Sequence, residues 1–173
     1  MFLFIYVQPL WKILLIIFLA ISLWTSVYLS FGNRSKYHLY WRILNGILLL
    51  ISICAAFYVT LLSRTLGNYD ISLIPFHTFR TAKDIPELYR EMLMNVFLFV
   101  PSGLTIPHIW SNKRSTGEKF ILSFLLLAFL SIIIEWAQYH FALGTAETDD
   151  VICNALGAFL GALPILITSK IQK

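Results

Sequence analysis

The residues with the clearest capacity for chemistry lie between Glu135 and Gly161, in the sequence EWAQYHFALGTAETDDVICNALGAFLG. Polar side chains here stand between two long apolar stretches: Glu135, Gln138, Asp149, Asp150 and Asn154. Because an unpaired polar group is costly in hydrocarbon, such a cluster is by default a hypothesis for a functional site. Two carboxylates with separated pKa values suit acid-base chemistry, with Glu135 as general acid or base and Asp150 as its ionised counterpart.

Helical spacing gathers these side chains onto shared faces. Glu135 and Gln138 are three residues apart on one predicted helix, and Asp150 and Asn154 are four residues apart on the next. Asn95, on a third helix, lies at a similar depth when each residue is given a rise of about 1.5 Å. We therefore expect one pocket with Glu135 and Asp150 as candidate catalytic residues. Its candidate ligand-binding residues are Asn95, Gln138 and Asn154, with Arg80 from a long loop.

A structural interpretation competes with this site. Polar side chains between membrane helices also act as interhelical hydrogen bonds, worth about 0.6 kcal/mol each on average, and Asp149 has the position of a helix cap. The cluster contains no obvious Ser-His or Cys-His pair for nucleophilic catalysis. Its carboxylates are the oxygen ligands that Mg²⁺ and Ca²⁺ prefer, so the sequence names no metal ligands but leaves a divalent cation open.

The composition predicts an integral membrane protein. The chain has 173 residues, of which 58% are hydrophobic and only 13% charged, with a mean hydropathy of +0.77. Soluble domains carry about 25% charged residues. Apolar stretches of about membrane-spanning length indicate an all-α bundle of five spans in one domain over residues 1–173. The expected spans are residues 9–31, 41–62, 91–110, 120–141 and 149–168.

Local signals modify this bundle at three places. The interval from Ser63 to Arg90 is long and polar, and such loops tend to be functional. Within it, the order Asp84-Ile-Pro-Glu87 resembles a capping box and predicts a short interfacial helix that leads into the third span. Pro101 predicts a kink or a break in that span. The pair Gly157 and Gly161 forms a GxxxG motif that permits close contact with another helix, here within the chain.

The basic residues predict an orientation. One side of the membrane receives Arg34, Lys36, Arg42, Lys113, Arg114, Lys119, Lys170 and Lys173, and the other receives Lys12, Arg64, Arg80, Lys83 and Arg90. By the positive-inside rule the N-terminus lies outside and the C-terminus in the cytoplasm. The long loop (63–90) and the acidic turn (142–148) therefore face outward. The basic residues are scattered among short loops, which argues against nucleic acid as a partner. Membrane lipids are the expected partners.

Four segments appear in an order that resembles the VanZ-like family: SLIPF (72–76), NVFLFVPSG (95–103), EWAQ (135–138) and GTAETDDVICNALGAFLG (144–161). The family's recurring positions fall here on Pro75, Asn95, Pro101, Gly103, Glu135, Gln138, Asp150, Asn154 and Gly157. Many members carry Arg where Gly144 or Thr145 stands and Asp where Glu147 stands. If that Arg binds an anion, this chain must supply another cation, and Arg80 is the candidate.

The resemblance implies a bacterial cell-envelope membrane protein that gives low-level resistance to the lipoglycopeptide teicoplanin. It carries no settled biochemical mechanism, so whether the chain is an enzyme stays open. The site would modify or bind a lipid, a lipid-linked wall precursor or the antibiotic. The alternative is a transporter or flippase component, for which a break at Pro101 would mark the binding site, or a structural membrane protein without chemistry of its own. The sequence does not fix the oligomeric state.

Overall fold

The computed structural model describes residues 10–28, 37–62, 70–85, 87–110 and 113–171. Within these ranges the predicted all-α class is confirmed. The long helices are α1 (Leu10–Val27), α2 (His38–Phe57), α4 (Glu87–Thr105), α5 (Thr116–His140) and α6 (Thr148–Ile171). Each overlaps one expected span. Parts of several predictions lie outside the described residues: Pro9, the end of the first span at 29–31, Arg34, Lys36, Arg64, Pro86 and Lys173.

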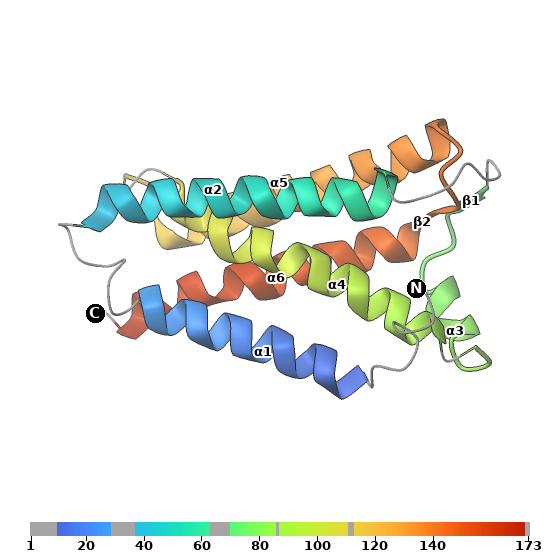
Figure 1. The fold of residues 1–173 in the computed structure, drawn as a ribbon, viewed down its shortest axis with the longest axis horizontal. Coiled ribbons are helices and arrows are strands. Elements are labelled where there is room, and N and C mark those ends of the chain that lie inside the picture. The colour runs from blue at the N-terminus through green and yellow to red at the C-terminus, as the bar shows by residue number, and fades with distance from the viewer. Residues whose placement is uncertain (1–9, 29–36, 63–69, 86, 111–112, 172–173) are drawn as a thin grey trace.

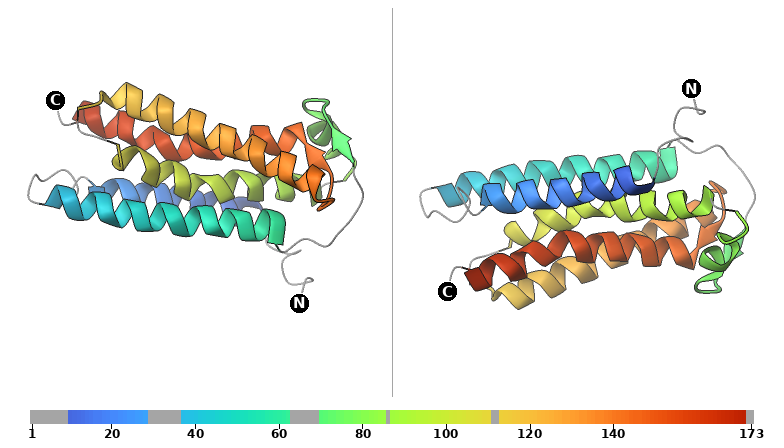
Figure 2. Two further views of the ribbon diagram at one scale, coloured as in Figure 1. Left: turned by 90° about the horizontal axis from the view of Figure 1, so that it is seen from above. Right: turned by 90° about the horizontal axis from the view of Figure 1, so that it is seen from below.

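The helices lie side by side along one long axis, as Figures 1 and 2 show. Three segments in the described part of the chain are long and apolar enough to cross a membrane: His38–Leu62, Thr116–His140 and Thr148–Ser169. Large apolar side chains such as Leu50 and Phe129 are exposed on the outside of the bundle, whereas polar ones such as Asn45 and Ser123 are fully buried. This inverted distribution is typical of a membrane protein, in which polar groups face the bundle interior.

Among the described helices, α4 and α6 make the most extensive contact, and glycine makes their close approach possible. A methyl group added at Gly157 would collide with the carbonyl group of Val96, and one at Gly161 with that of Val100. Gly103 of α4 fits the same seam from the other side, since its added methyl group would lie 2.5 Å from the carbonyl oxygen of Ala158. The predicted role of the GxxxG motif within the chain is therefore confirmed.

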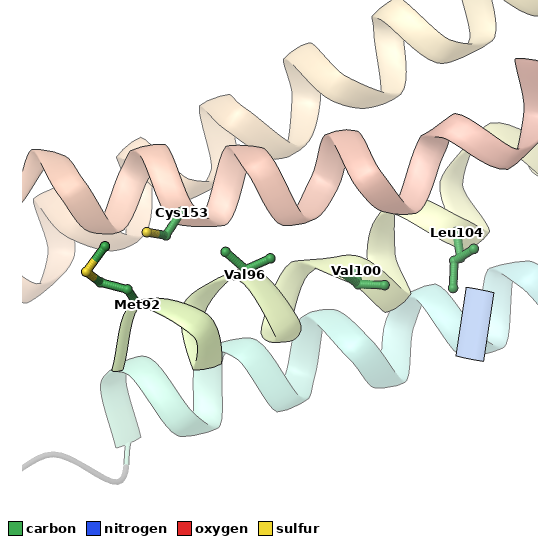
Figure 3. Close-up of a cluster of buried hydrophobic side chains, with 5 residues drawn as sticks. All are labelled: Met92, Val96, Val100, Leu104 and Cys153. Carbon is green, nitrogen blue, oxygen red and sulfur yellow. The ribbon is translucent and has the colours of Figure 1, made fainter. Parts of the chain in front are cut away.

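A row of apolar side chains runs along α4 beside this seam. Met92, Val96, Val100 and Leu104 recur at every fourth residue and are buried, and Cys153 of α6 lies beside Met92 (Figure 3). The spacing of four residues keeps this row on one face of the helix. Together with the glycine seam, this row fixes α4 against α6, so both helices present their N-terminal turns at the same end of the bundle.

The helix α4 runs unbroken through Pro101. Of the two outcomes that the sequence allowed, a kink or a break, the break is wrong, because helical structure continues to Thr105. The hydroxyl group of Thr105 donates to the carbonyl oxygen of Pro101 at 3.0 Å, which satisfies a group in the turn that follows the proline. The change of geometry comes later, at the 3₁₀-helix η5 (Ile106–His108), where Pro107 occupies the first turn.

The helix α2 ends in a π-helical turn, η4 (Tyr58–Leu62), that the sequence pattern does not predict. A π-helical turn leaves backbone groups that a regular α-helix would pair differently, and such turns occur frequently at functional sites. Here the hydroxyl group of Thr60 donates to the carbonyl oxygen of Ala56 at 2.7 Å. Earlier in α2, a hydrogen bond of 2.9 Å between the hydroxyl groups of Ser52 and Ser102 joins α2 to α4.

Two short strands and a short helix cover the end of the bundle at which α4 and α6 begin, on the right in Figure 1. The strands β1 (Ile71–Ser72) and β2 (Ala146–Glu147) pair in parallel and join the long loop to the acidic turn. The short helix α3 (His77–Thr81) precedes α4. The helix expected to begin after Asp84 and to lead into the third span is the first part of α4, which begins at Glu87. It is not a separate helix, and the short helix α3 ends at Thr81, before the capping-box residues.

Candidate functional site

A polar cavity of about 360 Å³ lies at the covered end of the bundle. The N-terminal part of α4, the first turn of α6, α3 and the segment leading into β2 all contribute to it. Its polar lining consists of Thr78, Arg90, Glu91, Asn95, Thr145, Glu147 and Asp150. Two residues that the sequence assigns to the site, Asn95 and Asp150, therefore share one cavity although they lie on different helices.

Helix geometry places the lining residues. Glu91 and Asn95 are four residues apart on α4, so they occupy one face of that helix. Asp150 is in the first turn of α6, where the helix dipole favours a carboxylate. Glu147 is held by a short hydrogen bond of 2.6 Å, in which the Thr78 hydroxyl group donates to its Oε2 atom. The cavity wall thus links β2 to α3.

Asp149 holds α3 in place beside this cavity. Its side chain is only 2% exposed, and its two carboxylate oxygens accept hydrogen bonds from the backbone N–H groups of Phe76 at 2.5 Å and Thr78 at 2.7 Å. Phe76 has a φ of 62°, a backbone conformation that is uncommon for a residue with a side chain. Asp149 therefore caps a helix, as expected, but that helix is α3 and not its own helix α6.

The charges in the cavity are mixed. Arg90 is the cationic side chain of the lining, and Glu91, Glu147 and Asp150 are the acidic ones. Acidic groups attract amines and accept hydrogen bonds from hydroxyl groups, while a guanidinium group pairs with carboxylate or phosphate. The arrangement therefore suits a ligand that carries hydrogen-bond donors together with an anionic group. No cluster of three or more His, Cys, Asp or Glu side chains that could hold a metal ion occurs among the described residues.

Glu135 lines a second hollow, and the lining of the polar cavity does not include it. This second hollow is an apolar groove of about 230 Å³ beside α5. The Glu135 side chain is 7% exposed, and its Oε2 atom accepts a hydrogen bond of 3.0 Å from the backbone N–H group of Glu147. Glu147 lines both hollows, so the structure places the two candidate catalytic residues, Glu135 and Asp150, in neighbouring hollows that share β2.

Gln138 and Asn154 lie deeper between the helices. Gln138 is fully buried and donates from Nε2 to the carbonyl oxygen of Thr60 in the π-helical turn at 3.1 Å. Asn154 is 1% exposed and donates from Nδ2 to the hydroxyl group of Ser131 at 2.9 Å. The amide oxygen of each has no hydrogen-bond partner within the described part of the structure. These contacts match the structural interpretation, and the ligand-binding role of both residues stays a prediction.

Arg80 is exposed on α3 and is absent from the lining of the polar cavity, whereas Arg90 belongs to that lining. Arg90 therefore has the better position to replace the family's arginine. Sequence reasoning did not assign Thr78, Thr145 or Glu147 to the site. A strand of two residues gives no periodic signal, so only the pairing of Ser72 with Glu147 reveals this side of the cavity.

Comparison with known proteins places the chain in a family. The sequence profile of the VanZ/LLP1 family matches residues 8–169. A protein of Enterococcus faecium named Protein VanZ is 38% identical over 73 residues, which make up 42% of this chain and 42% of that protein. The alignment thus covers less than half of that relative. No solved structure matches the chain. Since the family profile extends over nearly the whole sequence, the chain belongs to the VanZ/LLP1 family.

Proposed function

We propose that this multi-pass protein of the bacterial cytoplasmic membrane confers low-level resistance to lipoglycopeptide antibiotics such as teicoplanin. Its polar cavity faces outward and binds the polar part of a membrane-associated ligand: a lipid, a lipid-linked wall precursor or the antibiotic. The observation that carries this proposal is the single cavity that joins Asn95 of α4 to Asp150 of α6. Membership of the VanZ/LLP1 family supports the link to resistance.

The arrangement of the helices supports the outward orientation. The cavity lies at the end where α4 and α6 begin, and the basic residues Lys113, Arg114 and Lys119 lie at or near the start of α5, at the opposite end. Short loops rich in Lys and Arg stay in the cytoplasm. Five basic residues are assigned to the cavity side and count against this orientation: Lys12, Arg64, Arg80, Lys83 and Arg90.

Binding is favoured over acid-base catalysis by Glu135 and Asp150. A catalytic pair must reach the same reacting group, within hydrogen-bond distance or through one water molecule. The two carboxylates line different hollows, and one oxygen of Glu135 is used by the backbone of Glu147. The transporter alternative relied on a broken helix at Pro101, and α4 continues through that residue. A polar binding site requires neither feature.

The test is the teicoplanin susceptibility of a sensitive Gram-positive host that expresses the chain. The variants are Asn95→Ala, Asp150→Asn and the two combined, with Glu118→Gln as the control because Glu118 is an exposed acidic residue near the start of α5. We expect the double variant to lower the inhibitory concentration to that of cells without the chain, at equal membrane abundance. The control should keep full resistance. Full resistance from the double variant would reject the cavity as the functional site.

Glu135→Gln separates binding from catalysis. The substituted amide keeps an oxygen that can accept the Glu147 N–H hydrogen bond, but it cannot act as a general acid or base. Binding by the polar cavity predicts that this variant retains resistance. If resistance collapses while the amount of folded protein is unchanged, an acid-base role of Glu135 replaces the binding proposal.

A further inference from the structure

We propose that the apolar groove beside α5 holds one acyl chain of a membrane phospholipid whose headgroup lies in the polar cavity. The inference deepens the proposed function and rests on it: it names the ligand class as a two-part molecule, polar at one end and hydrocarbon at the other. The groove has a volume of about 230 Å³. Its apolar lining comes from α5, the β1 segment and α6: Ile71, Leu73, Ile132, Trp136, Tyr139 and Val151.

The position of the groove decides its occupant. Its walls at Ile132 and Trp136 belong to α5, one of the helices long and apolar enough to span a membrane, and both side chains are exposed on the outside of the bundle. Ile71 and Leu73 extend this exposed apolar surface beyond the end of the helix. In a bilayer such a surface meets lipid. The hydrocarbon chain of a neighbouring phospholipid is therefore the group available to fill the groove.

The groove offers little polar surface to any other ligand. Glu135 is its buried acidic member, and one of its carboxylate oxygens already accepts the N–H group of Glu147. A polar peptide or a sugar would lose its hydrogen bonds to water there without replacing them, which is costly. A hydrocarbon chain has no hydrogen bonds to lose.

The groove and the polar cavity are neighbours and share one lining residue. Glu147 of β2 lines both, and the pairing of β1 with β2 places Ser72 opposite Glu147. A lipid whose chain lies along α5 at the level of Trp136 therefore has its polar end beside β2. From there the headgroup reaches the cavity that contains Arg90 and Asp150. Arg90 suits the phosphate group, and the acidic side chains suit an amine or hydroxyl group.

Native mass spectrometry of the purified full chain, released from detergent, tests this assignment. Two adjacent isoleucines provide a matched pair, because Ile132 lines the groove and Ile133 does not, while both are exposed on α5. The wild-type chain and Ile133→Trp should each retain one phospholipid. Ile132→Trp fills the groove and should reduce the retained lipid at least fivefold. Equal retention by the two variants, or no lipid on the wild-type chain, would overturn the proposal.

Two further measurements keep the result interpretable. Leu73→Ser removes apolar surface from the groove on the loop side without adding bulk, and it should also reduce lipid retention. Its thermal unfolding temperature should match that of Ile133→Trp. Asp150→Asn should change which headgroups are retained, because it alters the polar cavity. If lipid loss from Ile132→Trp is observed while Asp150→Asn keeps both resistance and headgroup preference, the headgroup assignment and the proposed function fail together. If Asp150→Asn loses resistance but the isoleucine pair behaves alike, only the groove assignment fails.

Discussion

Replacing Asp149 with alanine should release α3 from the end of the bundle without unfolding the helices. The carboxylate of Asp149 is 2% exposed and accepts two backbone hydrogen bonds, from Phe76 at 2.5 Å and Thr78 at 2.7 Å. In the variant both N–H groups lose a charged partner. The long helices keep their contacts, because the glycine seam between α4 and α6 lies farther along the bundle.

The magnitude follows from the number of bonds. A hydrogen bond to a charged group contributes about 1.5 to 3 kcal/mol, so two of them hold α3 with about 3 to 6 kcal/mol before any new contact with water is counted. Since about 1.4 kcal/mol corresponds to a factor of ten, the lower value predicts that local opening of α3 becomes about a hundred times more frequent.

Hydrogen-deuterium exchange of the purified chain measures this opening. The backbone amides of Phe76 and Thr78 should exchange about a hundred times faster in Asp149→Ala, by the same count of hydrogen bonds. Asp150→Ala is the matched control, because it removes the neighbouring carboxylate from the same turn of α6 and should leave those two amides protected. Unchanged protection in Asp149→Ala, or equal loss in both variants, would refute the role assigned to Asp149.

Three further predictions concern the bundle. Gly157→Ala should lower thermal stability by about 1 to 3 kcal/mol through overpacking against Val96, whereas Gly46→Ala, which meets no atom within 4 Å, should be neutral or stabilising in the same melting experiment. Gln138→Leu should cost about 1 to 3 kcal/mol, because it leaves the Thr60 carbonyl group without its donor; an unchanged melting temperature would contradict this. A double-mutant cycle of Ser52→Ala and Ser102→Ala should give a coupling of about 1 kcal/mol, and additive effects would show that the hydrogen bond contributes nothing.

The sequence predicts the helices well because their signals are local and strong. Apolar stretches of spanning length locate the five long helices, and the spacing of Gly157 and Gly161 predicts a close helix contact that the structure shows against α4. Charge preference at a helix start correctly places Asp149 and Asp150 in the first turn of α6. Each of these features is set by neighbours within a few turns.

The parts that escape prediction depend on contacts between distant segments. The strand pair of Ser72 with Glu147 has two residues on each side, too few for a period. Asp149 caps a helix more than seventy residues away, which no local capping pattern describes. Glu135 is predicted at a depth similar to that of Asn95 but lines another hollow, because depth along a helix does not specify the direction in which a side chain points.

We predict that the polar cavity opens to the outside of the cell. A cysteine at Thr145, which lines the cavity, tests it in a chain whose native cysteines carry the replacements Cys54→Ser and Cys153→Ala. A membrane-impermeant maleimide should label Thr145→Cys in intact cells. Gly117→Cys, in an exposed position at the start of α5, should be labelled only after the cells are made permeable. Labelling of Gly117→Cys in intact cells, with Thr145→Cys protected until permeabilisation, would contradict it.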